Sequence, residues 1–312
     1  MTSSNAIWAE GLVKHFGDVH ALQGVSLEVP TATVLGVLGP NGAGKTTVVR
    51  ILTTLLQPDT GRGIVAGFDV SADPDSVRRN IGLAGQYAAV DENLTGRENL
   101  TLVGRLNHLA RAVATGRALE LLDQFHLSDA ANRPVRTYSG GMRRRLDLAA
   151  ALVTHPPVLL LDEPTTGLDP ASRQDLWAVI ETLVSDGTSV LLTTQYLEEA
   201  DRLADRIIVI DKGLVAAEGT AAELKARLGE TAVALQFETP AIAASAAALL
   251  LEFGAAQLPA DPVTVSIPLR GGARTVREVL NRLDAAGLEV GRIDLHEPTL
   301  DDVFISLTGA AS

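Results

Sequence analysis

The pattern of apolar and polar residues predicts strands and helices that alternate along most of the chain. Residues 25–29 alternate with period two, and residues 34–38 form the short apolar run of a buried strand, so residues 5–38 as a whole favour strands. A glycine-rich loop and an apolar helix over residues 47–56 follow. Residues 92–153 then contain several helical stretches, which predict a helical region after the first strands.

Strands and helices alternate again further along the chain. We expect short buried strands with helices between them, in the order strand 158–161, helix 174–185, strand 189–193, helix 197–204 and strand 206–210. Strands that alternate with helices at this spacing predict a parallel α/β sheet.

A second, smaller domain is predicted at the C-terminal end. Residues 220–223 match a capping box that opens a short helix, and Gly229 ends that helix. We therefore place a domain boundary there, between residues 1–229 and residues 230–312. Beyond Gly229 the predicted order is strand, helix, strand, helix, strand, which indicates a small α+β domain.

Composition excludes several classes of protein. The 312 residues are 46% hydrophobic but only 4% aromatic, so aliphatic side chains must fill the core. Cysteine is absent, which excludes disulfides and thiolate metal sites. No apolar stretch approaches the roughly 20 residues that cross a bilayer, and the N-terminus lacks the features of a signal peptide. We therefore expect a soluble chain that needs a partner for any membrane role. A net charge of −12 argues against nucleic acid as a partner, because phosphate contacts need a basic face.

The first candidate functional site along the chain is the glycine-rich loop after the strand at 34–38. The loop fits the phosphate-binding pattern G-x-x-x-x-G-K-[ST] with the residues Gly39, Pro40, Asn41, Gly42, Ala43, Gly44, Lys45 and Thr46. Glycines let backbone N–H groups turn toward a phosphate, and the N-terminus of the following helix adds its positive dipole. We expect Lys45 to reach the β- and γ-phosphates of ATP, Thr46 to ligate Mg²⁺, and Thr47 to add a phosphate contact.

An acidic motif follows the strand at 158–161. Asp162 and Glu163 stand at its carboxyl end, directly before Pro164. Together with the loop at Lys45, the motif predicts a Mg²⁺ ligand in Asp162 and, in Glu163, the carboxylate that polarises an attacking water. A strand followed by an acidic helix-capping turn is the structural alternative for these two residues.

A third motif is more specific. Residues 138–142 read Tyr-Ser-Gly-Gly-Met before a predicted helix; Ser139 is an N-cap type residue, and Gly140 and Gly141 expose backbone N–H groups at a helix start. This makes a second candidate anion site, for which an ordinary helix cap is the alternative. The segment resembles the signature motif of ATP-binding-cassette (ABC) proteins, and the order of motifs matches that family over roughly residues 5–228.

The resemblance implies further site residues. Gln86 stands where the family has the glutamine that reaches Mg²⁺ and the reacting phosphate, Asp169 matches the D-loop, and Phe16 takes the place of the aromatic ring that stacks on adenine. It also implies the family's fold, a P-loop NTPase cassette with a parallel sheet core, an antiparallel β part and a helical insert at about residues 87–153. Two copies would form a head-to-tail homodimer across two ATP molecules, in which the signature of one copy closes on the ATP of the other.

One position departs from the family pattern. Gln195 occupies the place of the histidine that contacts the γ-phosphate. A glutamine amide donates a hydrogen bond to a phosphate oxygen but takes up no proton. Gln195 can therefore still position the γ-phosphate, but a mechanism that needs a protonated residue at this place is disfavoured.

Gln195 and two other segments make the resemblance more specific, because they match one subfamily of ABC proteins. Gln195 with Tyr196, the run at residues 86–100 and the end at residues 298–304 are together similar to the daunorubicin/doxorubicin-resistance ATP-binding subunits. That subfamily implies a motor chain held peripherally on the cytoplasmic face of the cell membrane by an integral membrane permease subunit, which exports a drug-like or other hydrophobic substrate. At residues 298–304 a plain helix cap is an equal alternative.

Two other functions stay open. A non-transport ABC ATPase of the repair or translation type usually fuses two cassettes or carries zinc modules or coiled coils, and none of these is predicted here. A non-catalytic ATP-binding regulatory module is favoured only by Gln195, against intact Lys45, Asp162 and Glu163. The arginine run at residues 143–145 suggests nucleic-acid binding, but in an acidic chain we interpret it as a solvated or interface face of a helix.

Overall fold

The computed structural model describes residues 5–85, 90–227, 231–258, 261–269 and 272–308. The chain forms two compact units, divided between Ala221 and Ala222, with residues 307–308 grouped with the first unit. The division places nearly all of the short helix α8 (Ala221–Ala226) in the second unit, a few residues before the boundary expected at 229. Among the helices within these described ranges, none is long and apolar enough to span a membrane.

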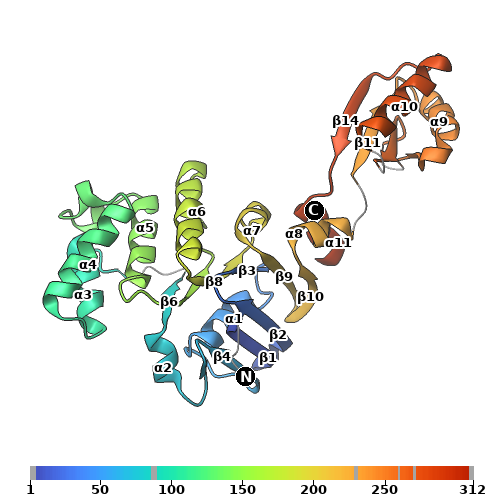
Figure 1. The fold of residues 1–312 in the computed structure, drawn as a ribbon. Helices are drawn as coiled ribbons and strands as arrows, with labels where there is room; N and C mark the ends of the chain where they lie inside the picture. Colours follow the sequence, from blue (N-terminus) through green and yellow to red (C-terminus); the bar gives the residue numbers. More distant parts are fainter. Residues whose placement is uncertain (1–4, 86–89, 228–230, 259–260, 270–271, 309–312) are drawn as a thin grey trace. The chain divides into compact units, whose positions relative to one another are not determined.

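A six-stranded sheet forms the centre of the first unit (Figure 1). Its order is β10-β9-β3-β8-β7-β6, and every neighbouring pair is parallel except β9 with β10. The strands are β3 (Val34–Leu38), β6 (Ile81–Ala84), β7 (Val158–Asp162), β8 (Ser189–Thr194), β9 (Arg206–Asp211) and β10 (Leu214–Gly219). The predicted parallel core is confirmed. Because β3, β8 and β7 are parallel neighbours, the residues that follow these three strands emerge at one edge of the sheet.

An antiparallel sheet covers one side of this core. Its order is β2-β1-β4-β5, from β1 (Asn5–Phe16), β2 (Val19–Pro30), β4 (Thr60–Val65) and β5 (Phe68–Asp69). Helix α1 (Lys45–Leu52) contributes Val48, Ile51 and Leu52 to an apolar cluster that also includes side chains from both sheets. The helix is therefore held between the two sheets, which fixes the direction in which its N-terminus points.

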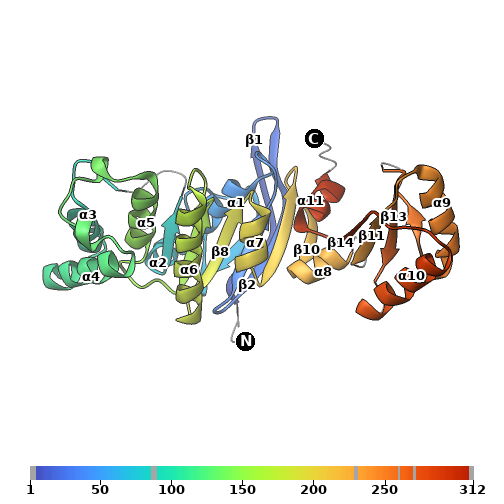
Figure 2. The same ribbon diagram turned by 90° about the horizontal axis from the view of Figure 1, so that it is seen from above.

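Helices cover the other face of the six-stranded sheet (Figure 2). Leu159 and Leu161 of β7 pack in the same apolar cluster as Trp177, whereas Leu160 belongs to the cluster around α1, as the period of two in a strand requires. The helices of this unit are α2 (Pro74–Arg79), α3 (Gly96–Leu106), α4 (Arg111–Gln124), α5 (Gly140–Ala151), α6 (Pro170–Ser185) and α7 (Leu197–Leu203), with 3-10 turns at Ser128–Ala130 and Val135–Thr137. Helices α3 to α5 form the insert between β6 and β7.

The second unit is a small α+β fold. Its antiparallel sheet has the order β12-β13-β11-β14, from β11 (Ala232–Gln236), β12 (Ala256–Gln257), β13 (Thr264–Pro268) and β14 (Arg292–His296). The helices are α9 (Pro240–Leu249), α10 (Ala273–Ala285) and α11 (Leu300–Thr308), with a 3-10 turn at Leu251–Phe253. Alternate residues Val233 and Leu235 pack against Val279 and Leu283 of α10. At the start of α11, the Asp302 N–H donates to Thr299 Oγ1 over 3.2 Å, so the residues 298–304 do contain a helix cap.

Candidate nucleotide-binding site

The glycine loop lies between the end of β3 and the start of α1. A Cβ at Gly39 would stand 2.3 Å from the Ile210 carbonyl oxygen, and one at Gly44, where φ is +115°, would stand 2.5 Å from the Ala21 carbonyl oxygen. Only glycine fits at either position. Gly44 is also the N-cap of α1 and offers no side-chain hydrogen bond. The first N–H groups of α1 therefore have no side-chain cap and are suited to bind an anion.

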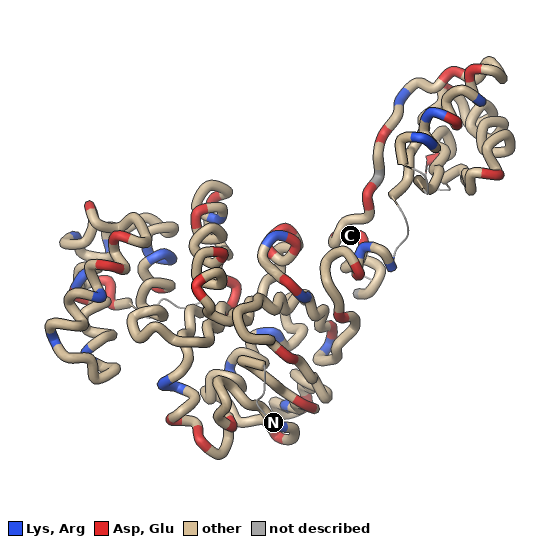
Figure 3. Tube along the Cα trace, viewed as in Figure 1, with Lys and Arg blue, Asp and Glu red and all other residues tan. Residues whose placement is uncertain are grey.

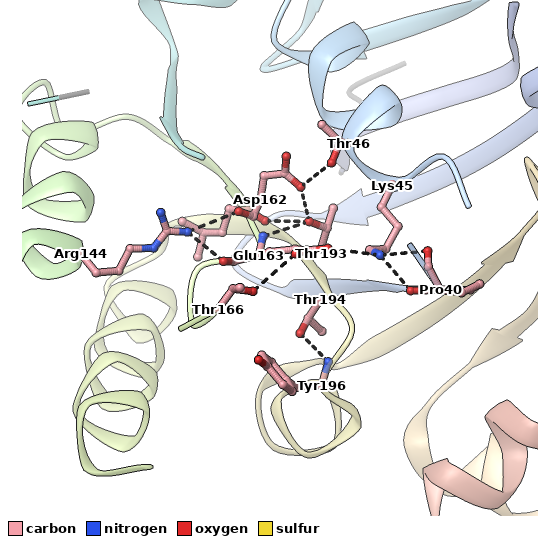
Figure 4. A network of polar contacts seen from close by, with 12 residues as sticks. Pro40, Lys45, Thr46, Arg144, Asp162, Glu163, Thr166, Thr193, Thr194 and Tyr196 are labelled. Carbon is pink, nitrogen blue, oxygen red and sulfur yellow. Dashed lines mark hydrogen bonds and ion pairs between the residues drawn. The ribbon is translucent and has the colours of Figure 1, made fainter. Parts of the chain in front are cut away.

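Lys45 folds back over this loop. Its Nζ donates to the Gly39 carbonyl over 2.8 Å and to the Pro40 carbonyl over 3.3 Å, and it lies 3.3 Å from Glu163 Oε1 (Figure 4). The residue is only 4% exposed. A buried ammonium is thus held over the glycine loop, next to the N-terminus of α1, where a phosphate could meet both.

Asp162 occupies the last position of β7, next to the start of α1. Thr46 Oγ1 donates to Asp162 Oδ1 over 3.2 Å, and Thr193 Oγ1, from the neighbouring strand β8, donates to the same oxygen over 2.6 Å (Figure 4). The register places Asp162 directly beside Thr193. The carboxylate is therefore fixed from one side while its second oxygen keeps free lone pairs for a cation.

Glu163 has a left-handed backbone, with φ of +52°. A residue with a side chain adopts this conformation at a cost of about 1–3 kcal/mol, and such strain clusters at functional sites. Two bonds hold it there, because the Glu163 N–H donates to the Thr193 carbonyl over 3.0 Å and to Thr193 Oγ1 over 3.1 Å. The turn aims the buried carboxylate back toward Lys45 instead of away from the sheet.

The signature segment begins α5 in the helical insert. Ser139 is its N-cap and accepts a hydrogen bond from the Met142 N–H over 3.2 Å, and Gly140 and Gly141 form its first turn. Figures 1 and 2 show α5 and α1 apart, on different sides of the sheet edge. One chain therefore presents two separate helix N-termini that suit anions, and they do not converge on one ligand.

Asp169 caps helix α6 and lies close to the signature segment. Its carboxylate accepts from the Ser172 N–H over 3.0 Å and from the Ser172 hydroxyl over 2.7 Å, and these hydrogen bonds lower the pKa of Asp169 below its usual value. A Cβ at Gly141 would stand 2.7 Å from that same hydroxyl. The cap of α6 and the first turn of α5 are thus in direct contact through Ser172.

The remaining expected site residues differ in how the structure places them. Phe16 ends β1 with its ring 47% exposed, and Lys14 Nζ lies 5.8 Å from the ring centre. Strand β2 of the same hairpin lies next to the glycine loop, where the Ala21 carbonyl stands close to Gly44. Gln195 follows β8 with an exposed side chain, and Thr47 is half-buried in the first turn of α1. Gln86 lies outside the described residues.

Comparisons with known proteins agree with this geometry. Residues 22–166 match the family model "ABC transporter", and residues 219–308 match the model of a DrrA1-3-like ATP-binding protein's C-terminal domain. A daunorubicin resistance ATP-binding protein of Streptomyces coeruleorubidus is 52% identical over 98% of this chain and 97% of its own length. The chain belongs to the ABC transporter ATP-binding family.

Two further likenesses support the same family. The daunorubicin/doxorubicin resistance ATP-binding protein of Streptomyces peucetius is 50% identical over 98% of this chain and 93% of its own length. Among solved structures, a dimeric ATP-binding cassette in a post-hydrolysis state with ADP and phosphate matches with a TM-score of 0.63 and 28% identity, over 69% of this chain and 98% of that one. The chain is an ABC ATPase, and the family fold expected from its motifs is confirmed.

Sequence reasoning missed two residues of this cassette's site. Thr193 holds both Asp162 and Glu163, and Arg144 donates to the backbone of the same acidic motif. The interpretation of residues 143–145 as a solvated or interface face is wrong for Arg144, whose side chain is only 13% exposed. Figure 3 shows the basic stretch on α5, and of its members Arg144 turns inward because buried carboxylates and carbonyls lie behind the helix.

Proposed function

We propose that this ABC ATPase is the motor subunit of an exporter for drug-like or other hydrophobic molecules, acting through a separate integral membrane permease. The cluster of Lys45, Thr46, Asp162 and Glu163 at one edge of the sheet carries the proposal, because it joins a phosphate-binding loop to a cation ligand and a base. The relatives are named as daunorubicin and doxorubicin resistance proteins, and these names support this class of substrate.

The site residues fit a Mg²⁺ ion. The Thr46 hydroxyl and the Asp162 carboxylate lie 3.2 Å apart and are hard oxygen donors, which Mg²⁺ prefers together with water and phosphate oxygens. Thr46 and Asp162 would hold the ion, and Gln86 is a further candidate ligand. When bound, Mg²⁺ neutralises charge on the phosphates during transfer.

The chain's own groups would then act on ATP in a defined order. Lys45 and the N–H groups of residues 39–44 would bind the phosphates, with Thr47 adding a contact, while Phe16 stacks on the adenine. Glu163 would polarise the attacking water, and Gln195 would position the γ-phosphate by an amide hydrogen bond. General-base catalysis of this kind contributes about 10²–10⁴ in rate.

The separation of the two helix N-termini supports a homodimer. Ser139 and Gly141 cannot serve the loop of their own chain, so we propose that they close on the ATP of a second copy, with Asp169 at the interface. A related cassette was solved as a dimer. The motor would sit peripherally on the cytoplasmic face of the membrane, bound to its permease.

A non-catalytic ATP-binding module is the second candidate, favoured only by Gln195 in place of histidine. The buried, paired geometry of Lys45 and Glu163 disfavours it, because a module that only binds needs no strained carboxylate beside the phosphate loop. Nucleic acid is not an expected partner. A repair or translation ATPase is disfavoured because the relatives are named as resistance proteins over nearly the full chain.

Hydrolysis and transport test the proposal separately. The purified protein should hydrolyse ATP with Mg²⁺, and Glu163→Gln should retain ATP binding but lose hydrolysis about 10²-fold or more, with ATP trapping a dimer on size-exclusion chromatography. A fully active Glu163→Gln protein would remove Glu163 from the chemistry. Cells that express the chain together with its permease should accumulate less fluorescent daunorubicin than cells in which the chain carries Lys45→Ala. Equal accumulation would contradict drug export while leaving the ATPase intact.

A further inference from the structure

One arginine of the signature helix is buried behind the catalytic motif. Arg144 lies five residues after the N-cap Ser139, and its side chain is 13% exposed, against 37% for its neighbour Arg143. Figure 4 shows its guanidinium pointing from α5 toward the carboxyl end of β7. It thus joins an element of the insert to an element of the sheet.

The guanidinium donates to backbone carbonyls from two separate segments. Its Nη2 reaches the Glu163 carbonyl over 2.9 Å and the Asp162 carbonyl over 3.3 Å, and its Nε donates to the Pro164 carbonyl. Its Nη1 donates to the Gly85 carbonyl, at the end of β6 and directly before Gln86. A planar fork with five N–H groups can serve several acceptors at once, which an ammonium cannot do in the same geometry.

Buried carboxylates lie around this cation. Arg144 Nη1 lies 3.6 Å from Asp147 Oδ2, and the Asp147 side chain is 1% exposed. Burial lowers the pKa of Arg144, and the charges of Asp147, Asp162, Glu199 and Glu163 oppose that change. Removing one partner from such a buried cluster leaves the other charges uncompensated, so the cluster holds its parts in one arrangement.

The geometry joins two places that the proposed function assigns to two different ATP molecules. The N-terminus of α5 would contact the ATP of the partner copy, whereas Glu163 would act on the ATP of the same chain. Arg144 is bonded to both elements within one chain. Movement of α5 on closing would therefore displace the backbone of Glu163.

We propose that Arg144 is a positioning residue that sets Glu163 and the Gly85 segment of its own subunit when the signature helix closes on the partner's ATP. This rests on the proposed ATPase dimer. Arg144 touches no substrate; it acts through backbone carbonyls of the catalytic motif. Within one subunit, the rate of ATP hydrolysis should therefore depend on Arg144, whereas the binding of nucleotide at Lys45 should not.

Steady-state kinetics test the residue against a matched control. Arg144→Gln should lower kcat about tenfold or more with the affinity for ATP nearly unchanged, and Arg144→Lys should recover part of the loss, since it keeps the charge without the fork. Arg145→Gln, one position further on the same helix, loses only a bond to the Phe125 carbonyl in the insert and should turn over like the parent. Thermal unfolding of each variant separates turnover from stability. An Arg144→Gln protein with parental kcat overturns the inference; an inactive parent overturns the proposed function instead.

Mixed dimers of two tagged chains test in which subunit Arg144 acts. In the first, one chain carries Arg144→Gln and Glu163→Gln together and its partner is unaltered; in the second, the two changes are on different chains. Action within one chain predicts that the first dimer, which keeps one intact site, hydrolyses ATP faster than the second. A merely structural role predicts equal rates, and action on the partner's ATP predicts the reverse order. Either of these two results overturns the inference.

Discussion

Glu163 shows how one residue's backbone prepares a reaction. Its backbone has a φ of +52°, and Thr193 holds it there by accepting two hydrogen bonds from the Glu163 N–H, one at its carbonyl and one at its hydroxyl. The same hydroxyl donates to Asp162. A single threonine on β8 therefore fixes both the turn at Glu163, the proposed base, and the orientation of Asp162, the proposed cation ligand, and its substitution should affect both.

Thr193→Val tests this role, because valine keeps the shape of threonine and removes only the hydroxyl. A hydrogen bond to a charged group contributes about 1.5–3 kcal/mol, so losing it should lower turnover about tenfold and raise the Mg²⁺ concentration needed for half-maximal activity. ATP binding without Mg²⁺ should stay at the parental level. A Mg²⁺ titration of ATPase activity decides; an unchanged half-maximal concentration would leave Thr193 with a structural role only.

Glu199 gives a prediction about pH. It is fully buried on α7 and accepts from Trp177 Nε1 over 3.0 Å, and its pKa is raised, mainly by burial, while the hydrogen bond from Trp177 opposes the change. A raised pKa means that the folded state favours the protonated form. The stability that this form contributes is present below the unfolded pKa and is lost as the pH rises through the folded pKa.

Glu199→Gln should therefore gain stability relative to the parent as the pH rises. The amide cannot ionise, yet its oxygen still accepts from Trp177. Urea unfolding from pH 4 to 8 measures the difference in free energy of unfolding between the two proteins. A difference that stays constant over this range would show that Glu199 ionises with the same pKa in both states.

The chemistry of single residues was predictable where a local pattern carried it. The pattern of the glycine loop predicts the roles of Lys45 and Thr46, and an apolar strand that ends in two carboxylates predicts the role of Asp162. Thr193 was missed because a threonine in a buried strand is ordinary, and only the pairing of β8 with β7 gives it a role. Arg144 was missed because a charged run in an acidic chain suggests solvent; its spacing of three from Asp147 was the available signal.

At the scale of elements, the N-terminus of α5 combines stability with ligand binding. Ser139→Ala removes the N-cap bond to the Met142 N–H, which should lower the free energy of unfolding by about 0.5–2 kcal/mol. It should also weaken ATP-dependent dimerisation of the Glu163→Gln protein, since a cap hydroxyl facing the partner's phosphate would be lost. Urea unfolding and size-exclusion chromatography read out the two effects. Ser139→Gly, which keeps a favourable cap, is the control for stability.

Strands that are continuous apolar runs were predicted, and a strand set only by tertiary pairing was not. The buried strands β3, β7 and β8 appear at nearly the expected positions because both faces are apolar. Strand β10 was not predicted, since most of its residues are exposed and it forms only through antiparallel pairing with β9. Helix α5 begins at Gly140 with Ser139 as its N-cap, as the serine before two glycines indicated.

At the scale of the whole molecule, the two units differ in whether they contain residues of the candidate site. Every described residue of the candidate site belongs to the first unit, and the second has its own apolar cluster. A truncated chain that ends at Gly229 should therefore fold and bind ATP, although contact with a permease would be lost if the second unit provides it. Circular dichroism and nucleotide binding check this. An unfolded product would show that residues 230–312 are needed for the fold of the cassette.

The ion pair between Lys45 and Glu163 has a consequence for the order of events at the site. Glu163 Oε1 lies 3.3 Å from the ammonium of Lys45, which on the proposed function would receive the phosphates. Bound phosphates would compete with the Glu163 carboxylate for this ammonium, and a displaced carboxylate would then be available to polarise water. On the proposed function, the base would thus stay paired with Lys45 until phosphates replaced it, and hydrolysis would depend on substrate to release its own catalyst.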